Sequence, residues 1–482
     1  MKHNRYIFFA VCFIFVALNC YAITRELFVV SFVSVGFGLF YLLFFRVDLL
    51  MYLMAIVTPF SVIMELGNGS LRLSVPAEPV MILLTGLFIC RIIYDLSFER
   101  KLWRHPISIA VYVYMLWMFI TCLTSELPLV SFKFLLSKIW FIVSSYFMLI
   151  QLIKNDIRKG ILYFSLSAAA LAIVVSITIV KHAMMGFSEL SAHWIMSPFY
   201  NDHTAYGAII ALFLPFSIGF IFLPNNNWLN RLFFIGITLI LLVGFYLSFS
   251  RAAWLSFAGA VGIWAVLKLR IKLSWLVVGM ALIGAFFYYF TDDILYRMSR
   301  NEQDSSGNII EHLQSITNIK TDASNVERLN RWVAAFDMIK ERPVTGWGPG
   351  TYQFVYAPFQ KSSYKTIITT DFGDGGNAHS EYIGPCAETG FVGLFTVLAL
   401  LGLSLYYGII TYIRSSDKTN RLLSLCASLA LVTYYIHGFL NNFLDTDKLS
   451  MPFWGCFAII LVCNTLNKKE ATSLTPNSEG IV

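Results

Sequence analysis

The sequences ERPVTGWGPGTYQFVY at residues 341–356 and NAHSEYIGPCAETGFVG at residues 377–393 close one long polar insertion and run directly into an apolar segment. His379 lies between the pair Gly375 and Gly376 and the start of that segment near Glu388. Glycine permits backbone conformations that other residues avoid. The pattern therefore predicts one histidine held where a pliable loop meets a rigid membrane helix.

The composition around this stretch belongs to no soluble class of protein. Hydrophobic residues make up 57% of the 482 residues, aromatic residues 16% and charged residues 13%. A bilayer core of ~30 Å requires roughly 20 apolar residues per helix. Uncharged segments of suitable length lie at 6–24, 27–45, 49–64, 79–90, 107–124, 139–153, 161–180, 204–223, 232–250, 252–267, 273–291, 389–413, 422–444 and 449–467. We therefore expect an all-α polytopic membrane protein with about 14 transmembrane helices, in a range of about 12–14.

Two of these segments are short. Segment 79–90 reaches a full span if Arg91 extends toward the membrane interface, and segment 139–153 is flanked by Lys138 and Lys154, which can do the same. The expected domains are an N-terminal scaffold of about seven helices at 1–200, helices 8–11 at 201–291, a large, partly helical extracytoplasmic loop at 292–383, C-terminal helices at 384–467 and a polar tail at 468–482.

Positive charges are distributed unevenly over the connecting loops. With a cytoplasmic N-terminus, nineteen lysines and arginines collect on one side, whereas the short loops of the other side hold seven. Short loops rich in Lys and Arg stay in the cytoplasm. The bias predicts that both termini are cytoplasmic and that the insertion is periplasmic. It also accounts for most of the net charge of +7, so the charge indicates no nucleic-acid partner.

The apolar run 232–267 is too long for one span. As a single helix its 36 residues would measure about 54 Å, well beyond a ~30 Å core. The run must turn, and SFSR at 248–251 is the place to do so. Arg251 is then expected at the outer membrane boundary and at the positive end of a helix dipole, which favours an anion such as a diphosphate. A guanidinium that reaches lipid headgroups is the alternative.

A helix is expected inside the insertion at 325–339, with a cap at Ser324 or Asn325 and an end at Pro343. Its apolar stripe would consist of Val326, Leu329, Val333, Phe336 and Ile339. Arg328 and Arg331 are three residues apart, so they share one face and can clamp a phosphate. A solvated charged face is the alternative.

The GWGPG sequence at 346–350 lacks the strand, the helix and the lysine of a nucleotide-binding loop. We expect a tight turn that returns to the membrane surface, with Trp347, Tyr352 and Tyr356 as interfacial aromatics or sugar-stacking platforms. His379 is the candidate general base, because imidazole titrates near neutral pH and can take a proton from a sugar hydroxyl. A surface histidine without a role is the alternative.

The connection at 182–204 carries His182, His193, Asp202 and His203. These are zinc-ligand types, but no pair has the spacing of a helical metal motif and no cysteine joins them. A polar outer loop beside the substrate is the simpler interpretation, with Asn201 or Asp202 capping the next helix. We expect no metal and no cofactor.

Four motifs jointly resemble the O-antigen ligase and polymerase family. They are NDHTAYG at 201–207, SFSRAAWL at 248–255, RLNRW at 328–332 with ERPVTGWGPG at 341–350, and NAHSEYIGPCAETGFVGL at 377–394. The resemblance covers roughly the C-terminal 280 residues. It implies an inverting, metal-independent glycosyltransferase that takes a glycan from undecaprenyl diphosphate at the periplasmic face of the bacterial inner membrane.

The resemblance also implies roles for individual residues. His379 would activate the acceptor hydroxyl and Arg251 would hold the lipid diphosphate. The family's loop arginine matches Arg328 best, with Arg331 as a close rival. Three further residues are expected to bind substrate: Glu388 in the ETG sequence, Tyr382 and Tyr352.

The acceptor separates the alternatives within the family. A ligase uses lipid A-core, whereas a polymerase uses a second lipid-linked glycan. A transporter for the same lipid-linked glycan is the alternative from another class. Transporters place ionisable groups near mid-membrane, whereas the predicted spans contain almost no interior charge apart from His437.

Overall fold

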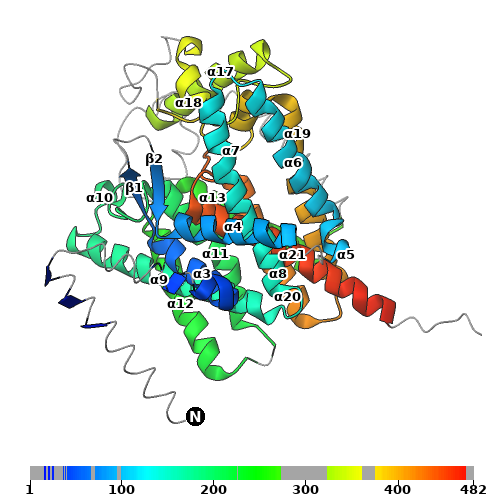
Figure 1. The fold of residues 1–482 in the computed structure, drawn as a ribbon. Coiled ribbons are helices and arrows are strands. Elements are labelled where there is room, and N and C mark those ends of the chain that lie inside the picture. The colour runs from blue at the N-terminus through cyan, green and yellow to red at the C-terminus, as the bar shows by residue number, and fades with distance from the viewer. Residues whose placement is uncertain are drawn as a thin grey trace, which may run out of the picture.

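The computed structural model describes residues 16–17, 20–21, 24–25, 36, 38–39, 41–66, 71–94, 99–224, 226–272, 323–360 and 375–473 (Figure 1). The predicted spans at 6–24 and 27–45 lie mostly outside these residues, and the predicted span at 273–291 lies wholly outside them. The same holds for the polar segment 292–322 and for the tail beyond residue 473.

The described part of the chain is almost entirely helical, and nine of its helices are long and apolar enough to cross a membrane. They are α4 (Ala77–Tyr94), α6 (Pro106–Leu123), the continuous helix Pro128–Ile153, α9 (Arg158–Met184), α11 (His203–Ile221), α12 (Trp228–Tyr246), α13 (Arg251–Leu269), α19 (Ile383–Arg414) and α21 (Asp447–Ser473), of which Asp447–Asn467 is the apolar part. The chain is thus an all-α polytopic membrane protein, as its composition predicts.

The remaining described elements are shorter or more polar. They are α3 (Val47–Val57), η1 (Thr58–Phe60), β1 (Val62–Leu66), β2 (Leu71–Val75), α5 (Arg100–Trp103), α10 (Glu189–Ala192), α17 (Ala323–Glu341), α18 (Tyr352–Val355), η3 (Ala357–Phe359) and α20 (Lys418–His437). The two strands form an antiparallel hairpin in which Val62 pairs with Val75.

The span predicted at 49–64 is wrong. Its helix, α3, has 11 residues, about 16 Å, which is too short to cross a membrane. Pro59 at the start of η1 cannot donate a helical hydrogen bond, and the chain turns into the hairpin from Val62.

The boundaries predicted for segment 139–153 are also wrong. The helix begins eleven residues earlier, at Pro128, and consists of α7 (Pro128–Ile142), a π-helical turn η2 (Val143–Phe147) and α8 (Met148–Ile153). Lys138 therefore lies inside a span, where it is 5% exposed, and does not reach toward the interface. Segment 79–90, by contrast, extends past Arg91 to Tyr94 as predicted.

The core of the bundle forms around α21 and α11. Both helices are buried along most of their length, and α20 packs against both of them as well as against α13 and α19. Large apolar side chains remain exposed on the outer helices, as expected for surfaces that face lipid. In Figure 1, α6, α7 and α19 rise from this bundle toward α17 and α18, which lie together at one end.

Candidate active site

The apolar run 232–267 turns where its length requires. α12 ends at Tyr246 and α13 begins at Arg251, so the SFSR sequence forms the predicted connection. The Ser250 hydroxyl caps α13 by accepting a hydrogen bond from Ala253 N at 3.4 Å. Arg251 therefore stands in the first turn of the helix, where the helix dipole adds to its positive charge.

The NDHTAYG motif packs beside this turn. Asp202 caps α11, because its Oδ1 accepts hydrogen bonds from Thr204 N and Ala205 N, each at 2.8 Å. A Cβ added at Gly207 would lie 2.8 Å from Ser250 Cβ, so this glycine permits the close approach of α11 to the turn. The predicted cap is confirmed, with Asp202 as the capping residue.

Of the histidines in the 182–204 connection, His182 bonds to the backbone and the other two bond to each other. His182 Nε2 lies 3.0 Å from Ser188 O, which ties the connection to itself. The Nδ1 atoms of His193 and His203 are 3.1 Å apart, so one ring donates to the other. Among the described residues, no three His, Cys, Asp or Glu side chains are grouped to hold a metal.

His203 links the SFSR turn to the insertion. The positive charges of Arg251 and of Arg328, which lies on α17, both interact electrostatically with the His203 imidazole. Arg328 acts in the same way on His437, at the end of α20, and on His379. Arg328 thus lies within electrostatic range of imidazoles on α11, on α20 and in the segment before α19, and Arg251 lies within range of the one on α11.

The predicted helix of the insertion is present as α17, Ala323–Glu341, but of the predicted apolar stripe only Ile339 is buried among the side chains that the structure describes. Phe336 is 49% exposed, whereas the buried face carries polar side chains as well as apolar ones. Its residues are Glu327, Asn330, Arg331, Ala334, Ala335, Met338 and Ile339. The small alanines allow α17 to pack on α19, and the buried Glu327 and Arg331 side chains pair with each other.

Arg331 belongs to this buried face and holds the segment before His379. Its Nε lies 2.8 Å from Glu327 Oε1, and its Nη1 donates to Asn377 O at 3.0 Å. A Cβ added at Gly376 would lie 2.0 Å from that Nη1, so the segment needs glycine there. Arg328, one turn from it, stays partly exposed. The two arginines that the sequence left as rivals therefore occupy different environments.

His379 adopts a left-handed backbone conformation, with φ of +47°. Its N–H donates to Asn377 Oδ1 at 3.1 Å, a local bond that helps to fix this conformation. Burial, with the nearby charges of Arg331 and Arg328, lowers the pKa of His379 to about 3. The imidazole is thus neutral at physiological pH and can accept a proton.

The helix that follows is kinked at Gly390, where φ is +71° and ψ is −176°. This conformation is practically restricted to glycine. At the kink, backbone N–H and C=O groups of α19 lose their partners within the helix. Backbone groups of the GWGPG turn and of the residues before it replace those partners. The three bonds run from Trp347 N to Ala387 O at 3.1 Å, from Gly348 N to Glu388 O at 2.8 Å and from Phe391 N to Pro343 O at 2.8 Å. The GWGPG and ETG sequences therefore form one structural unit.

The tight turn predicted at 346–350 is present, and its glycines are required by close packing. Gly346 and Gly348 have φ of +66° and +112°. A Cβ at Gly346 would lie 2.4 Å from the Glu388 carbonyl carbon, and one at Gly348 would lie 2.0 Å from Ser125 Oγ. Glu126 N also donates to Trp347 O at 3.0 Å, which fastens the turn to the connection between α6 and α7.

The aromatic residues near this turn form a core, and their predicted place at the membrane interface is wrong. Trp347, Tyr352 and Tyr356 are 8%, 2% and 0% exposed. They pack with Met338 and Ile339 of α17 in a small cluster that is separate from the main core. Tyr352 also donates its hydroxyl to Arg331 O at 2.7 Å. These rings stabilise the insertion against α19.

Glu381, two residues after His379, was not predicted as a site residue. Its Oε1 accepts hydrogen bonds from Phe443 N at 2.9 Å and Leu444 N at 3.0 Å, and its own N–H donates to Gly438 O at 2.8 Å. Burial, together with the charge of Asp445, raises the pKa of this carboxyl group. Glu381 thus fastens the His379 segment to the loop 438–446 that follows α20.

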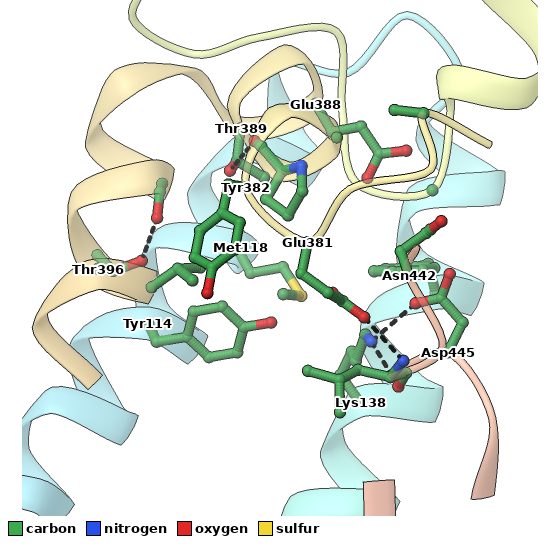
Figure 2. Close-up of a pocket in the computed structure, with 18 of the residues that line it drawn as sticks. Tyr114, Met118, Lys138, Glu381, Tyr382, Glu388, Thr389, Thr396, Asn442 and Asp445 are labelled. Atoms are coloured by element: carbon green, nitrogen blue, oxygen red, sulfur yellow. Dashed lines mark hydrogen bonds and ion pairs between the residues drawn. The ribbon is translucent and has the colours of Figure 1, made fainter. Parts of the chain in front are cut away.

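A cavity of about 310 Å³ lies beside this segment and the 438–446 loop (Figure 2). Three residues predicted to bind substrate line it: Glu388, Tyr382 and Tyr352. The Glu388 carboxylate accepts a hydrogen bond from Tyr352 N at 3.1 Å, and the Tyr382 hydroxyl donates to Tyr435 O at 2.8 Å. His379 is not among the lining residues, although its neighbours are.

Lys138 and Asp445 form an ion pair at the cavity, with Nζ 2.9 Å from Oδ1. Lys138 Nζ also donates to Leu444 O at 2.8 Å. The expectation that the spans hold almost no interior charge apart from His437 is therefore wrong, because Lys138 and Glu388 both lie within them. An ionisable residue in an apolar run is by itself a sign of function, and at Lys138 that sign was available in the sequence.

The kink provides a test of this architecture. We expect Gly390→Ala to lower the thermal stability of the purified protein, because alanine in this conformation costs about 1–3 kcal/mol and its Cβ would lie 2.0 Å from Val344 O. Gly402→Ala is the matched control, since it lies in the same helix with no atom within 4 Å of an added Cβ. Equal melting temperatures for the two variants would contradict the role of the kink.

A family comparison covers this region of the chain. Residues 236–398 match the model of a family described as O-antigen ligase. The match begins in α12, contains Arg251, Arg328 and His379, and ends in α19 beyond the kink. It spans about a third of the chain and confirms the resemblance seen in the motifs of this segment. A comparison with curated proteins finds no match.

Proposed function

Because residues 236–398 carry an O-antigen ligase domain, we propose that the protein transfers a glycan from undecaprenyl diphosphate to a hydroxyl group of lipid A-core. The observation that carries this proposal is the family match itself, since the matched segment contains Arg251, Arg328 and His379. These residues come from α13, α17 and the segment before α19, which are far apart in the sequence. They combine positive charge with a neutral imidazole, the two functions that this transfer requires.

The arginines act on the leaving group. A lipid diphosphate leaves with negative charge on its oxygen atoms, and guanidinium groups stabilise that charge where it develops. Arg251 adds the positive end of the α13 dipole at the same place. In this proposal the two arginines supply the charge neutralisation that a metal ion supplies in other transferases, so the reaction proceeds without a metal or another cofactor.

His379 acts on the nucleophile. Its imidazole takes the proton of the acceptor hydroxyl while that oxygen attacks the anomeric carbon of the donor sugar. A new bond forms between this carbon and the acceptor oxygen, the bond to the diphosphate oxygen breaks, and undecaprenyl diphosphate departs with the bonding electrons. Attack opposite the leaving group inverts the anomeric configuration. The left-handed conformation of His379 and the contacts of Asn377 and Glu381 fix the backbone that carries the ring.

The distribution of charge supports the placement of this reaction. The two loops that lie one predicted span away from the insertion, 268–272 and 414–421, each carry three lysines or arginines, so the positive-inside bias favours the periplasmic face of the bacterial inner membrane for the insertion. There the lipid-linked donor, lipid-linked acceptors and the surrounding membrane lipids share one leaflet. The same chemistry with a second lipid-linked glycan as acceptor would make the protein an O-antigen or exopolysaccharide polymerase, which the same family comparison supports.

Deletion of the gene tests the proposed function directly. We expect lipopolysaccharide to lose its long chains on a gel while lipid-linked polymer accumulates, because donor is made but not transferred. Single repeat units left on the core would instead assign the polymerase reaction. Unchanged lipopolysaccharide and exopolysaccharide in the deletion strain would contradict both reactions.

A further inference from the structure

The ionisable groups that line the cavity beside the His379 segment are mainly acidic, in contrast to the arginines Arg251, Arg328 and Arg331. Three carboxyl groups, Glu381, Glu388 and Asp445, line it together with a single cation, Lys138. Lys138 is already bound to Asp445 Oδ1 and to Leu444 O. No second cation lines the cavity among the described residues, and any of these carboxyl groups that is ionised repels the diphosphate of the proposed donor, because like charges in a partly buried site are costly. The cavity is therefore unsuited to the donor's diphosphate.

Its remaining features suit a hydroxyl-rich ring without charge. The aromatic residues Tyr114 and Trp117 line one side, and aromatic rings pack well against the faces of sugars. In Figure 2 the Tyr114 hydroxyl points into the space toward Glu381. The side chain of Asp445 is 45% exposed, and Asn442 Oδ1 is buried without a hydrogen-bond partner among the described residues. Carboxylate and amide oxygens of this kind accept hydrogen bonds from sugar hydroxyls.

The position of the cavity relates it to the proposed reaction. Asn377 and Ala378 before His379, and Glu381 and Tyr382 after it, belong to the cavity wall. The segment that carries the imidazole thus forms part of the cavity wall, and Arg331 binds this segment at Asn377 O. The volume of about 310 Å³ lies at the lower end of small-molecule sites, which range from about 300 to 1,000 Å³.

We propose that this cavity binds an uncharged sugar of the acceptor and rejects anionic sugars. The assignment to the acceptor rests on the proposed transferase function. The selection for an uncharged ring rests on the cavity alone. Asp445 is the residue that sets the selection, because it combines a negative charge with exposure to the space.

Binding can be measured on the full chain in lipid nanodiscs. The probes are 4-nitrophenyl β-D-glucoside and 4-nitrophenyl β-D-glucuronide, which differ in a carboxylate at one carbon, and the readout is quenching of tryptophan fluorescence, since Trp117 and Trp454 line the cavity. We expect saturable quenching by the glucoside and at least about tenfold weaker binding of the glucuronide. Tyr114→Phe should weaken glucoside binding by roughly two- to tenfold through the loss of one hydrogen bond.

Asp445→Asn is the deciding variant, because asparagine keeps an oxygen that accepts the hydrogen bond of Lys138 and removes the charge. It should bring the two probes to within about threefold of each other by strengthening glucuronide binding. Equal binding of both probes to the unaltered protein, no saturable quenching, or an unchanged ratio in Asp445→Asn would overturn the proposal.

Transfer activity measured on the same nanodiscs separates the two hypotheses. Activity without selective glucoside binding removes the cavity proposal and leaves the transferase function intact. Selective binding without transfer to any lipid-linked acceptor removes the proposed function and, with it, the assignment of the bound sugar to the acceptor.

Discussion

Replacement of His379 by alanine lowers glycan transfer by about 10²–10⁴-fold in the reaction proposed for this protein, the range for loss of a general base. The protein itself should remain in the membrane, because the His379 side chain is only partly buried and the segment is held by neighbouring groups. Transfer would be measured with purified protein and lipid-linked donor. His379→Gln keeps a polar side chain of similar length without a basic nitrogen and should be as inactive.

The pH dependence of the unaltered protein carries a second signature of the same base. In the free protein, burial and the charges of Arg331 and Arg328 hold the pKa of His379 at about 3, so its proton is absent over the whole neutral range. A bound diphosphate neutralises the nearby guanidinium charge and thereby raises this pKa. Because kcat reports the complex and kcat/KM the free protein, the acidic limb of kcat should lie at the higher pH.

Two results would remove His379 from the mechanism. One is full transfer activity of His379→Ala at normal protein levels. The other is an acidic limb of kcat that persists unchanged in His379→Gln, since a limb caused by this imidazole must disappear with it. Membrane levels and thermal stability of both variants serve as controls.

Features that depend on length or local pattern could be predicted from the sequence. The run 232–267 exceeds a bilayer core, so the turn at SFSR followed from geometry and is present. The helix of the insertion and its end before Pro343 followed from spacing and from the restrictions on proline. Asp202 as a helix cap followed from the known preference for aspartate there.

Features that depend on distant partners could not be predicted in this way. Lys138 is tolerated inside a span because Asp445, 307 residues later, neutralises it. The buried face of α17 was misassigned because arginine is usually a surface residue. Arg331 is buried, and its bonds to Glu327 and to Asn377, 46 residues away, satisfy its charge and its N–H groups. The kink at Gly390 likewise depends on Pro343, Trp347 and Gly348 as new partners.

The difference between local patterns and distant partners also explains which site residues could be named from the sequence. Arg251, Arg328 and His379 were named from motifs, and all three lie in the segment that matches the O-antigen ligase family. Glu381 was missed because a carboxylate near the start of a helix is common. Its importance becomes visible through the three backbone bonds that it makes to a loop some sixty residues away.

The contrast between the two loop arginines leads to the second large effect. We expect Arg328→Ala to lower transfer by about 10²–10³-fold, the range for removal of one group that stabilises developing negative charge. Its melting temperature should change less than that of Arg331→Ala. In the latter variant Glu327, which is 3% exposed, loses its ion pair with Arg331, and breaking a buried ion pair in this way costs about 3–5 kcal/mol.

Arg331 thus acts through structure, and a double variant distinguishes this role from direct contact with the substrate. Replacing both partners, as in Glu327→Gln with Arg331→Met, removes the buried charges together and should restore much of the melting temperature lost in Arg331→Met alone. Activity should recover in parallel, to the extent that the segment carrying Asn377 and His379 regains its position. If stability returns in the double variant while transfer stays as low as in Arg328→Ala, Arg331 itself contacts the donor. That result would refute the assignment of a structural role to Arg331 and a catalytic role to Arg328.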